Sequence, residues 1–348
     1  MRAARLTAFR APLEIGEAAD PPCPADGVAV RVLACGVCRS DWHAWTGADP
    51  DVALPHIPGH EFCGVVEEAD PATRWRAGDR VVVPFILACG RCADCAAGHQ
   101  TVCAHQIVPG FTAPGAFAER IAVPRADANA AALPEGMDPA VAASLGCRVT
   151  TAWHALTGPA ALRPGEWLAV HGAGGVGLSA VMLGAAMGAR VVAVDIVEEK
   201  LAFARSLGAE AAIDAENAPE TIREITAGGA HVSVEALGVA ATTRASLACL
   251  RPLGRHVQIG MPAGPHAEMA LPMDLVYARQ LALHGTRGMP GWKFPPLFDM
   301  IAGGRLDPAP LVTRRIGLSA VSDELAAMDG PTPPGVAVVT DFREEAHA

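Results

Sequence analysis

One run of small residues in this chain has the spacing that binds a dinucleotide: Gly172-Ala173-Gly174-Gly175-Val176-Gly177. Gly172 would allow a tight turn, Gly174 a close approach of the backbone to a pyrophosphate, and Gly177 close packing of the following helix. The pyrophosphate would lie at the N-terminus of that helix, where free N–H groups and the helix dipole favour negative charge. The alternative is that these small residues serve only ordinary packing of a helix on a strand.

An acidic residue, Asp195, follows the glycines at the distance expected for a contact to the adenosine ribose, about twenty residues on. A carboxylate there would accept hydrogen bonds from the ribose hydroxyls and repel a ribose phosphate. The next residues, Ile196 and Val197, offer no arginine to bind such a phosphate. The pattern therefore predicts NAD, not NADP, as the cofactor.

A second group with chemical potential is a cluster of four cysteines within fifteen residues: Cys89, Cys92, Cys95 and Cys103. Four thiolates at this spacing can surround one tetrahedral zinc ion and leave no position for a substrate. The alternatives are reduced cysteines without a metal, or disulfides. The spacing and the loop-like surroundings favour a structural zinc site.

The elements around the glycine run have the order of a nucleotide-binding unit. Trp167–His171 predicts a buried strand, an Ala/Leu/Met-rich helix follows, and Val191–Val194 predicts a second strand. Strands and helices continue to alternate as far as Leu281–His284. This rhythm predicts an α/β fold with a doubly wound parallel sheet.

The segments on either side have a different pattern. From Leu6 to Val83, short β-branched runs alternate with Gly and Pro, which predicts a small antiparallel β domain, and Phe111–Pro124 predicts more β structure. Ala140–Leu156 has a helical period, broken near Gly146. Beyond Gly288 the chain is expected to return to the first domain.

Bulk properties limit the possible functions. The chain has 348 residues, which predicts two domains, and its net charge of −10 argues against general nucleic-acid binding. No signal peptide or membrane-spanning run is apparent, and ten cysteines suggest metal ligands more than disulfides. We therefore expect a cytoplasmic protein with no nucleic-acid or membrane partner.

Taken together, these motifs resemble those of the zinc-dependent alcohol dehydrogenases of the medium-chain dehydrogenase/reductase superfamily. The resemblance covers essentially the full length, and it depends on Cys35–His43, Gly59-His60-Glu61, the four-cysteine lobe, Cys147 and the glycine run with Asp195. It implies a GroES-like β-rich catalytic domain, 1–147 and 286–348, with a structural zinc lobe at 89–103. The Rossmann domain would be 148–285.

The resemblance implies a second, catalytic zinc bound by Cys38, His60 and Cys147. Two thiolates and an imidazole leave a fourth position for an alcohol oxygen, which the metal would polarise. Without the resemblance, Cys147 would more often be a core residue. Glu61 matches a family residue near the zinc that can coordinate it, and Asp41 matches a residue that orients the ligand histidine. Either acid could instead be a solvated residue at a strand end.

Further roles follow from the same resemblance. Ser40 and His43 match a proton relay that carries the alcohol proton to solvent through the cofactor ribose. Contacts to the cofactor would come from Arg39 (pyrophosphate), Lys200 (adenosine ribose), Thr151 and Val176 (nicotinamide), in addition to Gly172, Gly174, Gly175, Gly177 and Asp195. Lys200 could equally be an exposed helix lysine.

The sequence departs from the family at its last predicted strand, Val336–Thr340, which lacks an arginine that often contacts the pyrophosphate. We expect phosphate binding to depend more on Arg39 and on the helix N-terminus.

The hypothesis is an NAD-dependent enzyme, with two zinc ions per chain, that interconverts an alcohol (a primary alcohol by analogy) with an aldehyde or ketone as a homodimer or homotetramer. The alternatives are a polyol or sugar-alcohol dehydrogenase, a specialised secondary-metabolite reductase, and a silent relative that only binds dinucleotide. Cys147 argues against the polyol branch, which often has glutamate there. The presence of all ligand and relay residues argues against the silent relative.

Overall fold

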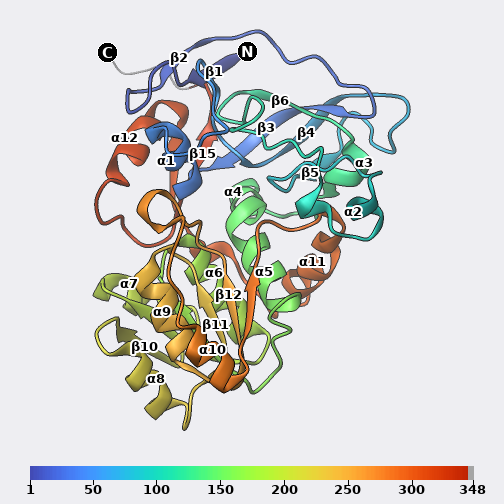
Figure 1. Ribbon diagram of the computed structural model, residues 1–348. Coiled ribbons are helices and arrows are strands. Elements are labelled where there is room, and N and C mark those ends of the chain that lie inside the picture. The colour runs from blue at the N-terminus through green and yellow to red at the C-terminus, as the bar shows by residue number, and fades with distance from the viewer. Residues whose placement is uncertain (344–348) are drawn as a thin grey trace.

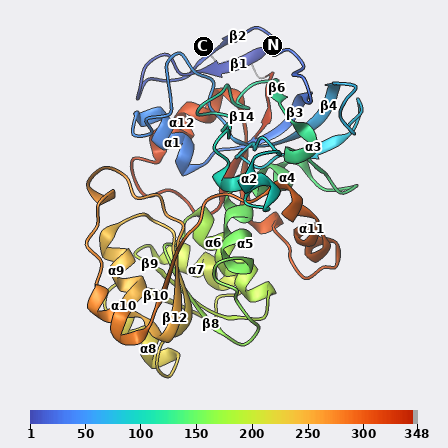
Figure 2. The ribbon, with the colours of Figure 1, turned by 45° about the vertical axis from the view of Figure 1, so that its right-hand side comes forward.

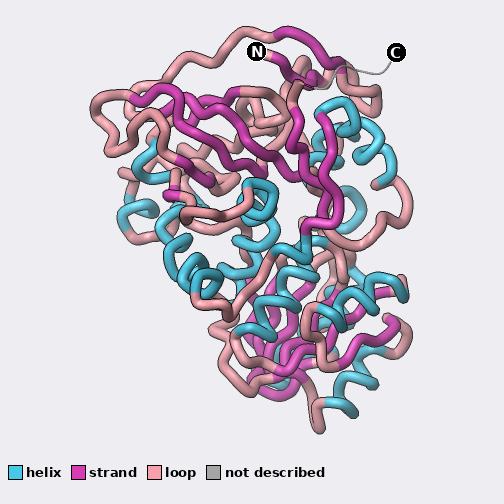
Figure 3. The backbone as a smooth tube through the Cα atoms, turned by 180° about the vertical axis from the view of Figure 1, so that it is seen from behind, coloured by secondary structure: helices cyan, strands magenta, loops and turns pink. Residues whose placement is uncertain are grey.

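The computed structural model describes residues 1–343; the last part of the 286–348 segment, residues 344–348, lies outside the described residues. The chain forms a β-rich lobe above a lobe built on a parallel sheet (Figure 1). Viewed from behind, the strands form two separate groups (Figure 3). Among the described residues, no helix has both the length and the apolar composition to cross a bilayer.

The lower lobe contains a six-stranded parallel sheet in the order β10-β9-β8-β11-β12-β13. This is the doubly wound order of dinucleotide-binding folds, in which β8 and β11 flank the point where the direction of winding reverses. The predicted α/β class is confirmed. The strands are β8 Trp167–His171, β9 Arg190–Asp195, β10 Ala211–Asp214, β11 Ala230–Glu235, β12 Leu250–Gln258 and β13 Ala282–Gly285. The helices are α6 Gly175–Ala186, α7 Glu198–Ser206, α8 Ala218–Ile225, α9 Ala240–Ala248 and α10 Met273–Arg279.

The upper lobe contains a sheet in the order β14-β15-β3-β4-β5-β7, with β6 paired to β3. All its pairings are antiparallel except β14 with β15. The expected return of the chain beyond Gly288 is confirmed, since β15 pairs with β3 and places Val338 opposite Gly36. The strands of this lobe are β1 Arg2–Arg5, β2 Glu14–Glu17, β3 Val28–Gly36, β4 Glu61–Ala69, β5 Arg80–Val82, β6 Arg120–Val123, β7 Ala131–Ala132, β14 Val312–Gly317 and β15 Val336–Asp341.

One prediction in this lobe is mostly wrong. Within Phe111–Pro124 only β6, Arg120–Val123, is a strand, and 111–119 consists mainly of turns and isolated bridges. This segment contains Pro114, Gly115 and alternating small residues, and its backbone bonds go to the 57–59 loop and to the N-terminal strand. Here Gly and Pro outweigh the β-branched signal.

Short helices connect and cover the sheets. They are α1 Arg39–Thr46, α2 Ala93–Ala96, α3 Ala126–Asn129, α4 Pro139–Ser144, α5 Thr150–Thr157, α11 Phe294–Ala302 and α12 Val321–Ala327. Single 3₁₀ turns are η1 Gln100–Val102, η3 Gly264–His266, η4 Gly291–Lys293, η5 Ala309–Leu311 and η6 Leu318–Ala320. The predicted break near Gly146 is a π-helical turn, η2 Leu145–Val149, between α4 and α5.

This broken helix joins the two lobes. Its apolar side chains, including Leu145 and Leu156, belong to one buried cluster with Leu168 of β8 and with Ala34 and Val82 of the upper sheet. In Figure 2, α4 and α5 run from the upper sheet down to α6. Residues on the π-turn are therefore held rigidly where the two sheets meet.

Candidate metal centres and dinucleotide site

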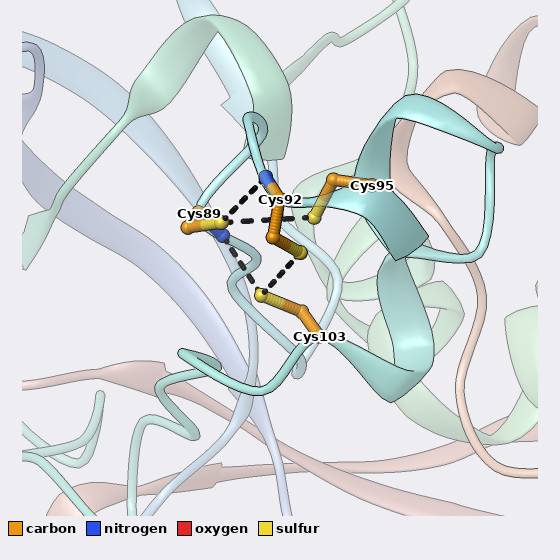
Figure 4. Close-up of side chains that lie close together, drawn as sticks. All are labelled: Cys89, Cys92, Cys95 and Cys103. Atoms are coloured by element: carbon orange, nitrogen blue, oxygen red, sulfur yellow. Dashed lines mark hydrogen bonds between the residues drawn. The ribbon is translucent and has the colours of Figure 1, made fainter.

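The four cysteines predicted to bind a structural zinc lie together around α2 and η1. The Sγ atoms are 3.9 Å apart for Cys89 and Cys95, and 3.8 Å apart for Cys92 and Cys103 (Figure 4). Four sulfurs at about 2.3 Å from one tetrahedral zinc ion lie about 3.8 Å from each other. A disulfide would need about 2.05 Å, and all four thiols are free. The spacing fits a metal cage and rejects the disulfide alternative.

Backbone N–H groups also point at these sulfurs. Cys92 N donates to Cys89 Sγ at 3.3 Å, Cys89 N to Cys103 Sγ at 3.3 Å, and His105 N to Cys103 Sγ at 3.4 Å. Such donors stabilise a thiolate over a thiol. Backbone N–H groups, first that of Arg91 and then that of Cys92, lower the pKa of Cys89 to about 6. Donors that favour a thiolate are therefore present at Cys89 and Cys103.

The second group unites residues that are far apart in sequence. Cys38 caps α1, His60 precedes β4, and Cys147 lies on the π-turn. Their ligand atoms, with a carboxylate oxygen of Glu61, all lie within 4.8 Å of one another, and all four side chains are buried. The three residues that the family resemblance assigned to a catalytic zinc are thus brought together.

The histidine of this group is oriented for a metal. His60 Nδ1 lies 2.9 Å from Asp41 Oδ1, and the same carboxylate accepts from Cys38 N at 2.9 Å and Gly59 N at 3.2 Å. A carboxylate partner fixes Nδ1 as the protonated nitrogen and leaves Nε2 with its lone pair. Among the described residues, Nε2 has no hydrogen-bond partner although it is fully buried. A zinc ion would satisfy that atom, so these residues fit the metal.

Charge at this site favours ligation. The hydrogen bond from Cys147 and the charge of Arg148 hold the pKa of Cys38 well below its usual range. Beside the group lies an apolar wall, in which Phe85 and Phe111 contact the His60 ring edge to face at 5.8 and 5.3 Å. Three protein ligands would leave the fourth position of a tetrahedral zinc ion for one small ligand.

The predicted relay residues lie on α1, next to these ligands. Ser40 Oγ is 3.9 Å from Cys38 Sγ, and His43 follows one helical turn later, half-buried. His43 Nδ1 has no partner among the described residues. Burial, and then the charge of Arg39, lower the pKa of His43, so its ring is neutral at pH 7 and able to accept a proton.

The glycine run connects β8 to α6. Gly172 has φ +97°, and a Cβ there would approach Leu237 Cγ to 2.6 Å. A Cβ on Gly177 would lie 1.7 Å from the carbonyl oxygen of Gly172, so helix and turn can meet only without a side chain. The start of α6 has no side-chain cap. Nothing lies within 4 Å of a Cβ placed on Gly174, the residue before α6, so a ligand can approach the backbone there.

Asp195 ends β9 beside this turn. Its carboxylate accepts from Ala173 N at 2.7 Å, Ile196 N at 2.9 Å and Val197 N at 3.1 Å. Lys200 is half-buried in the first turn of α7, two residues into that helix. Thr151 is buried on α5, and its Oγ1 has no partner among the described residues, as expected of a hydroxyl facing a ligand.

Arg39 has other partners. Its Nη1 donates to the carbonyl oxygen of Met328 at 2.5 Å, and its guanidinium lies 4.7 Å from the Trp42 ring centroid. These contacts direct it toward α12, and none of its hydrogen bonds among the described residues reaches the glycine run.

The sequence analysis missed Arg148. This arginine follows the candidate ligand Cys147, is 6% exposed and forms a buried ion pair with Glu61. Glu61 Oε1 accepts from Arg148 Nε at 2.9 Å and from its backbone N at 3.2 Å, and Oε2 accepts from Nη2. A single charge inside the otherwise uncharged helical stretch Ala140–Leu156 was the signal that could have identified it.

Comparison with known proteins gives two family matches. Residues 24–135 match the alcohol dehydrogenase GroES-like domain, and residues 175–303 match the zinc-binding dehydrogenase domain. An alcohol dehydrogenase of Geobacillus stearothermophilus is 38% identical over 313 residues, 88% of this chain and 90% of that protein. An alcohol dehydrogenase of Rhizobium meliloti is 34% identical over 82% of this chain and 84% of that protein.

Solved structures give the same result. An alcohol dehydrogenase from Thermus sp. ATN1 superposes with a TM-score of 0.90 at 30% identity, covering 98% of this chain and 100% of that chain. A zinc-binding dehydrogenase from Sinorhizobium meliloti, solved with NADP, superposes with a TM-score of 0.86 at 28% identity, covering 97% and 98%.

Proposed function

This chain belongs to the zinc-containing alcohol dehydrogenases of the medium-chain dehydrogenase/reductase superfamily, and from that premise we propose that it oxidises an alcohol to an aldehyde or ketone with NAD. The observation that carries the proposal is the buried Nε2 of His60, which has no hydrogen-bond partner in the described part of the chain and lies beside Cys38 and Cys147. A zinc ion held there would polarise an alcohol oxygen, and the nicotinamide would accept the hydride.

The chain's own residues provide the path for the alcohol proton. Ser40 lies next to the ligand sulfur of Cys38, close enough for its hydroxyl to meet a substrate oxygen. His43 is neutral near pH 7 and half-exposed, so it can pass the proton to solvent. Asp41 holds the His60 ring, and the apolar wall of Phe85 and Phe111 excludes water from the reacting atoms.

The proposed preference for NAD depends on Asp195. Its carboxylate lies at the end of β9, where a phosphate on the adenosine ribose would meet a negative charge. The test compares kcat/KM for NAD and NADP in wild type, Asp195→Ala and the matched control Asp214→Ala, which changes the residue in register with Asp195 on β10. We expect NAD preference in wild type and the control, and its loss in Asp195→Ala. Preference of the wild type for NADP would contradict the proposal.

The substrate proposed is a small primary alcohol. The residues around the metal ligands are apolar: Val52, Phe85, Ile86, Val108 and Phe111. NADH formation should be measured with primary, secondary, benzylic and polyol substrates, before and after removal of zinc. Turnover of primary alcohols that disappears with the metal supports the proposal. Turnover of polyols alone favours the polyol alternative, and silence of zinc-loaded protein favours a dinucleotide-binding relative.

We further propose two zinc ions per chain, a nucleotide-binding domain at 148–285 and a catalytic domain from the flanking segments. Ten free thiols support a reducing, cytoplasmic location. The edge strand β13, with Tyr277 86% and Met273 58% exposed on the neighbouring helix, supports assembly of two or four copies.

A further inference from the structure

Arg148 is a buried cation at the junction of the two lobes. It lies on the π-turn that interrupts the helix between α4 and α5, one residue after the ligand Cys147. Such π-turns are rare and occur frequently at functional sites. A buried guanidinium needs strong compensation, so its surroundings should explain why it is there.

Glu61 binds only two of the three guanidinium nitrogens of Arg148. The ion pair uses Nε and Nη2 of the guanidinium. The remaining nitrogen, Nη1, makes no hydrogen bond to any residue in the described range 1–343. Because a guanidinium offers five donors, Nη1 is left with unused capacity for an anion.

The free nitrogen faces the dinucleotide motif. A Cβ placed on Gly175, the first residue of α6, would lie 3.4 Å from Arg148 Nη1 and 2.4 Å from its Cδ. The arginine therefore packs directly against the N-terminus of α6, a helix start that has no side-chain cap among the described residues. On its other side, a Cβ on Gly36 would lie 2.9 Å from Nη2, and Gly36 pairs with Val338 of β15, a strand without any cationic residue.

We propose that Arg148 binds the pyrophosphate of the dinucleotide through Nη1, together with the N-terminus of α6, while Nε and Nη2 keep Glu61 fixed beside the metal ligands. This inference rests on the proposed dinucleotide function. It also replaces the sequence-based emphasis on Arg39, whose guanidinium is directed to Met328 and Trp42.

The test must separate a contact to the phosphate from a simple counter-ion of Glu61. Arg148→Met alone would leave the Glu61 charge buried without a partner, which is strongly destabilising. The double variant Arg148→Met/Glu61→Gln removes both charges. The matched control is Arg255→Met/Glu166→Gln, which removes a partly buried pair that bridges β12 and the turn before β8, away from the glycine run.

Zinc-loaded protein is titrated with NADH by fluorescence, and ADP-ribose and adenosine are used as competitors. ADP-ribose contains the pyrophosphate and adenosine does not. We expect the Kd of NADH and ADP-ribose to rise about 10- to 100-fold in the double variant, the effect of losing one hydrogen bond from a charged donor. The Kd of adenosine should stay unchanged, and the control should bind all three as wild type does.

Wild-type affinity for ADP-ribose in a folded double variant would overturn the inference and leave Arg148 as the counter-ion of Glu61. If wild type itself bound neither NADH nor ADP-ribose, the proposed function would fail, and this inference with it. If the double variant does not fold, Arg148→Lys provides the test, because lysine keeps the charge but loses the fork. Arg148→Lys should raise the Kd of ADP-ribose severalfold and leave the Kd of adenosine unchanged. A Kd of ADP-ribose equal to that of wild type would overturn the inference.

Discussion

The cysteine cage and the Cys38–His60–Cys147 site use the same chemistry of sulfur but are completed in different ways. The cage takes all four ligands from residues 89–103, and its own backbone N–H groups donate to the sulfurs. The second site draws its candidate ligands from three separate segments, and two buried polar atoms near it, His60 Nε2 and Thr151 Oγ1, have no hydrogen-bond partner within residues 1–343. The cage is closed by its own loop, whereas the second site is left incomplete toward a metal, a substrate and a cofactor.

This difference predicts that the cysteine cage contributes to stability and the second site to activity. A closed four-sulfur site can only contribute to folding, because it has no free position. In the proposed function, the Cys38–His60–Cys147 site (the open site) depends on Asp41 to hold the ligand His60 in place and on His43 to exchange a proton with solvent. Substitutions at the two sites should therefore change different measured quantities.

The largest expected effect is on activity at the open site. Cys147→Ser should lower kcat/KM for alcohol oxidation by about 10³-fold or more, because the ion that stabilises the developing charge is lost. Zinc content, measured by atomic absorption, should fall by one ion per chain. Retention of wild-type activity with one ion fewer would show that the two sites have been assigned in the wrong order.

The matching change at the cage should act on stability. Cys103→Ser should reduce the free energy of unfolding by at least about 3 kcal/mol, since a structural metal contributes directly to folding. The measurement is urea denaturation. Cys23→Ser, at a half-buried thiol outside both sites, is the control and should have little effect. If Cys103→Ser unfolded like the control, the cage would not be a folding determinant.

A smaller effect is expected at Asp41, which orients a candidate zinc ligand of the open site without itself being one. Asp41→Asn should weaken zinc binding at the open site by about 10- to 100-fold, because the partner of His60 Nδ1 is altered. Competition with a chelator measures this affinity. The control Asp138→Asn makes the same chemical change at the N-cap of α4, where Asn caps about as well as Asp, and it should leave zinc affinity unchanged. Equal zinc affinity in Asp41→Asn and wild type would make Asp41 a structural residue only.

The smallest effect concerns proton exchange. His43→Gln should lower kcat at pH 7 by about tenfold. The pKa of His43 is lowered from its ordinary value of 6.5. Its ring is therefore neutral and able to accept a proton at pH 6.5 and above, and it becomes charged only at lower pH. The wild-type rate should therefore fall as pH drops below 6.5, and this fall should be absent in His43→Gln. A pH profile that is identical in both proteins would remove His43 from the relay.

Much of the fold followed from local patterns. Strand β8 lies at the predicted residues Trp167–His171, because a five-residue apolar run that ends at a glycine-rich turn is too short for a helix and favours a buried strand. The predicted break near Gly146 is present, but its form was not predictable. A π-turn depends on what it must pack against, here Glu61 and the backbone of β4.

The sequence by itself determined the sites whose residues lie close together along the chain. Four cysteines within fifteen residues, or four glycines within six, can be brought together by turns in the short chain between them, without any contact from a distant segment. Only the tertiary structure decided which distant residues meet. Arg148 and Glu61 are 87 positions apart, and their pairing required the packing of one helix between two sheets. That packing directs Arg148 toward the dinucleotide motif, while Arg39 is directed toward α12. Neither direction can be predicted from the spacing of residues along the chain.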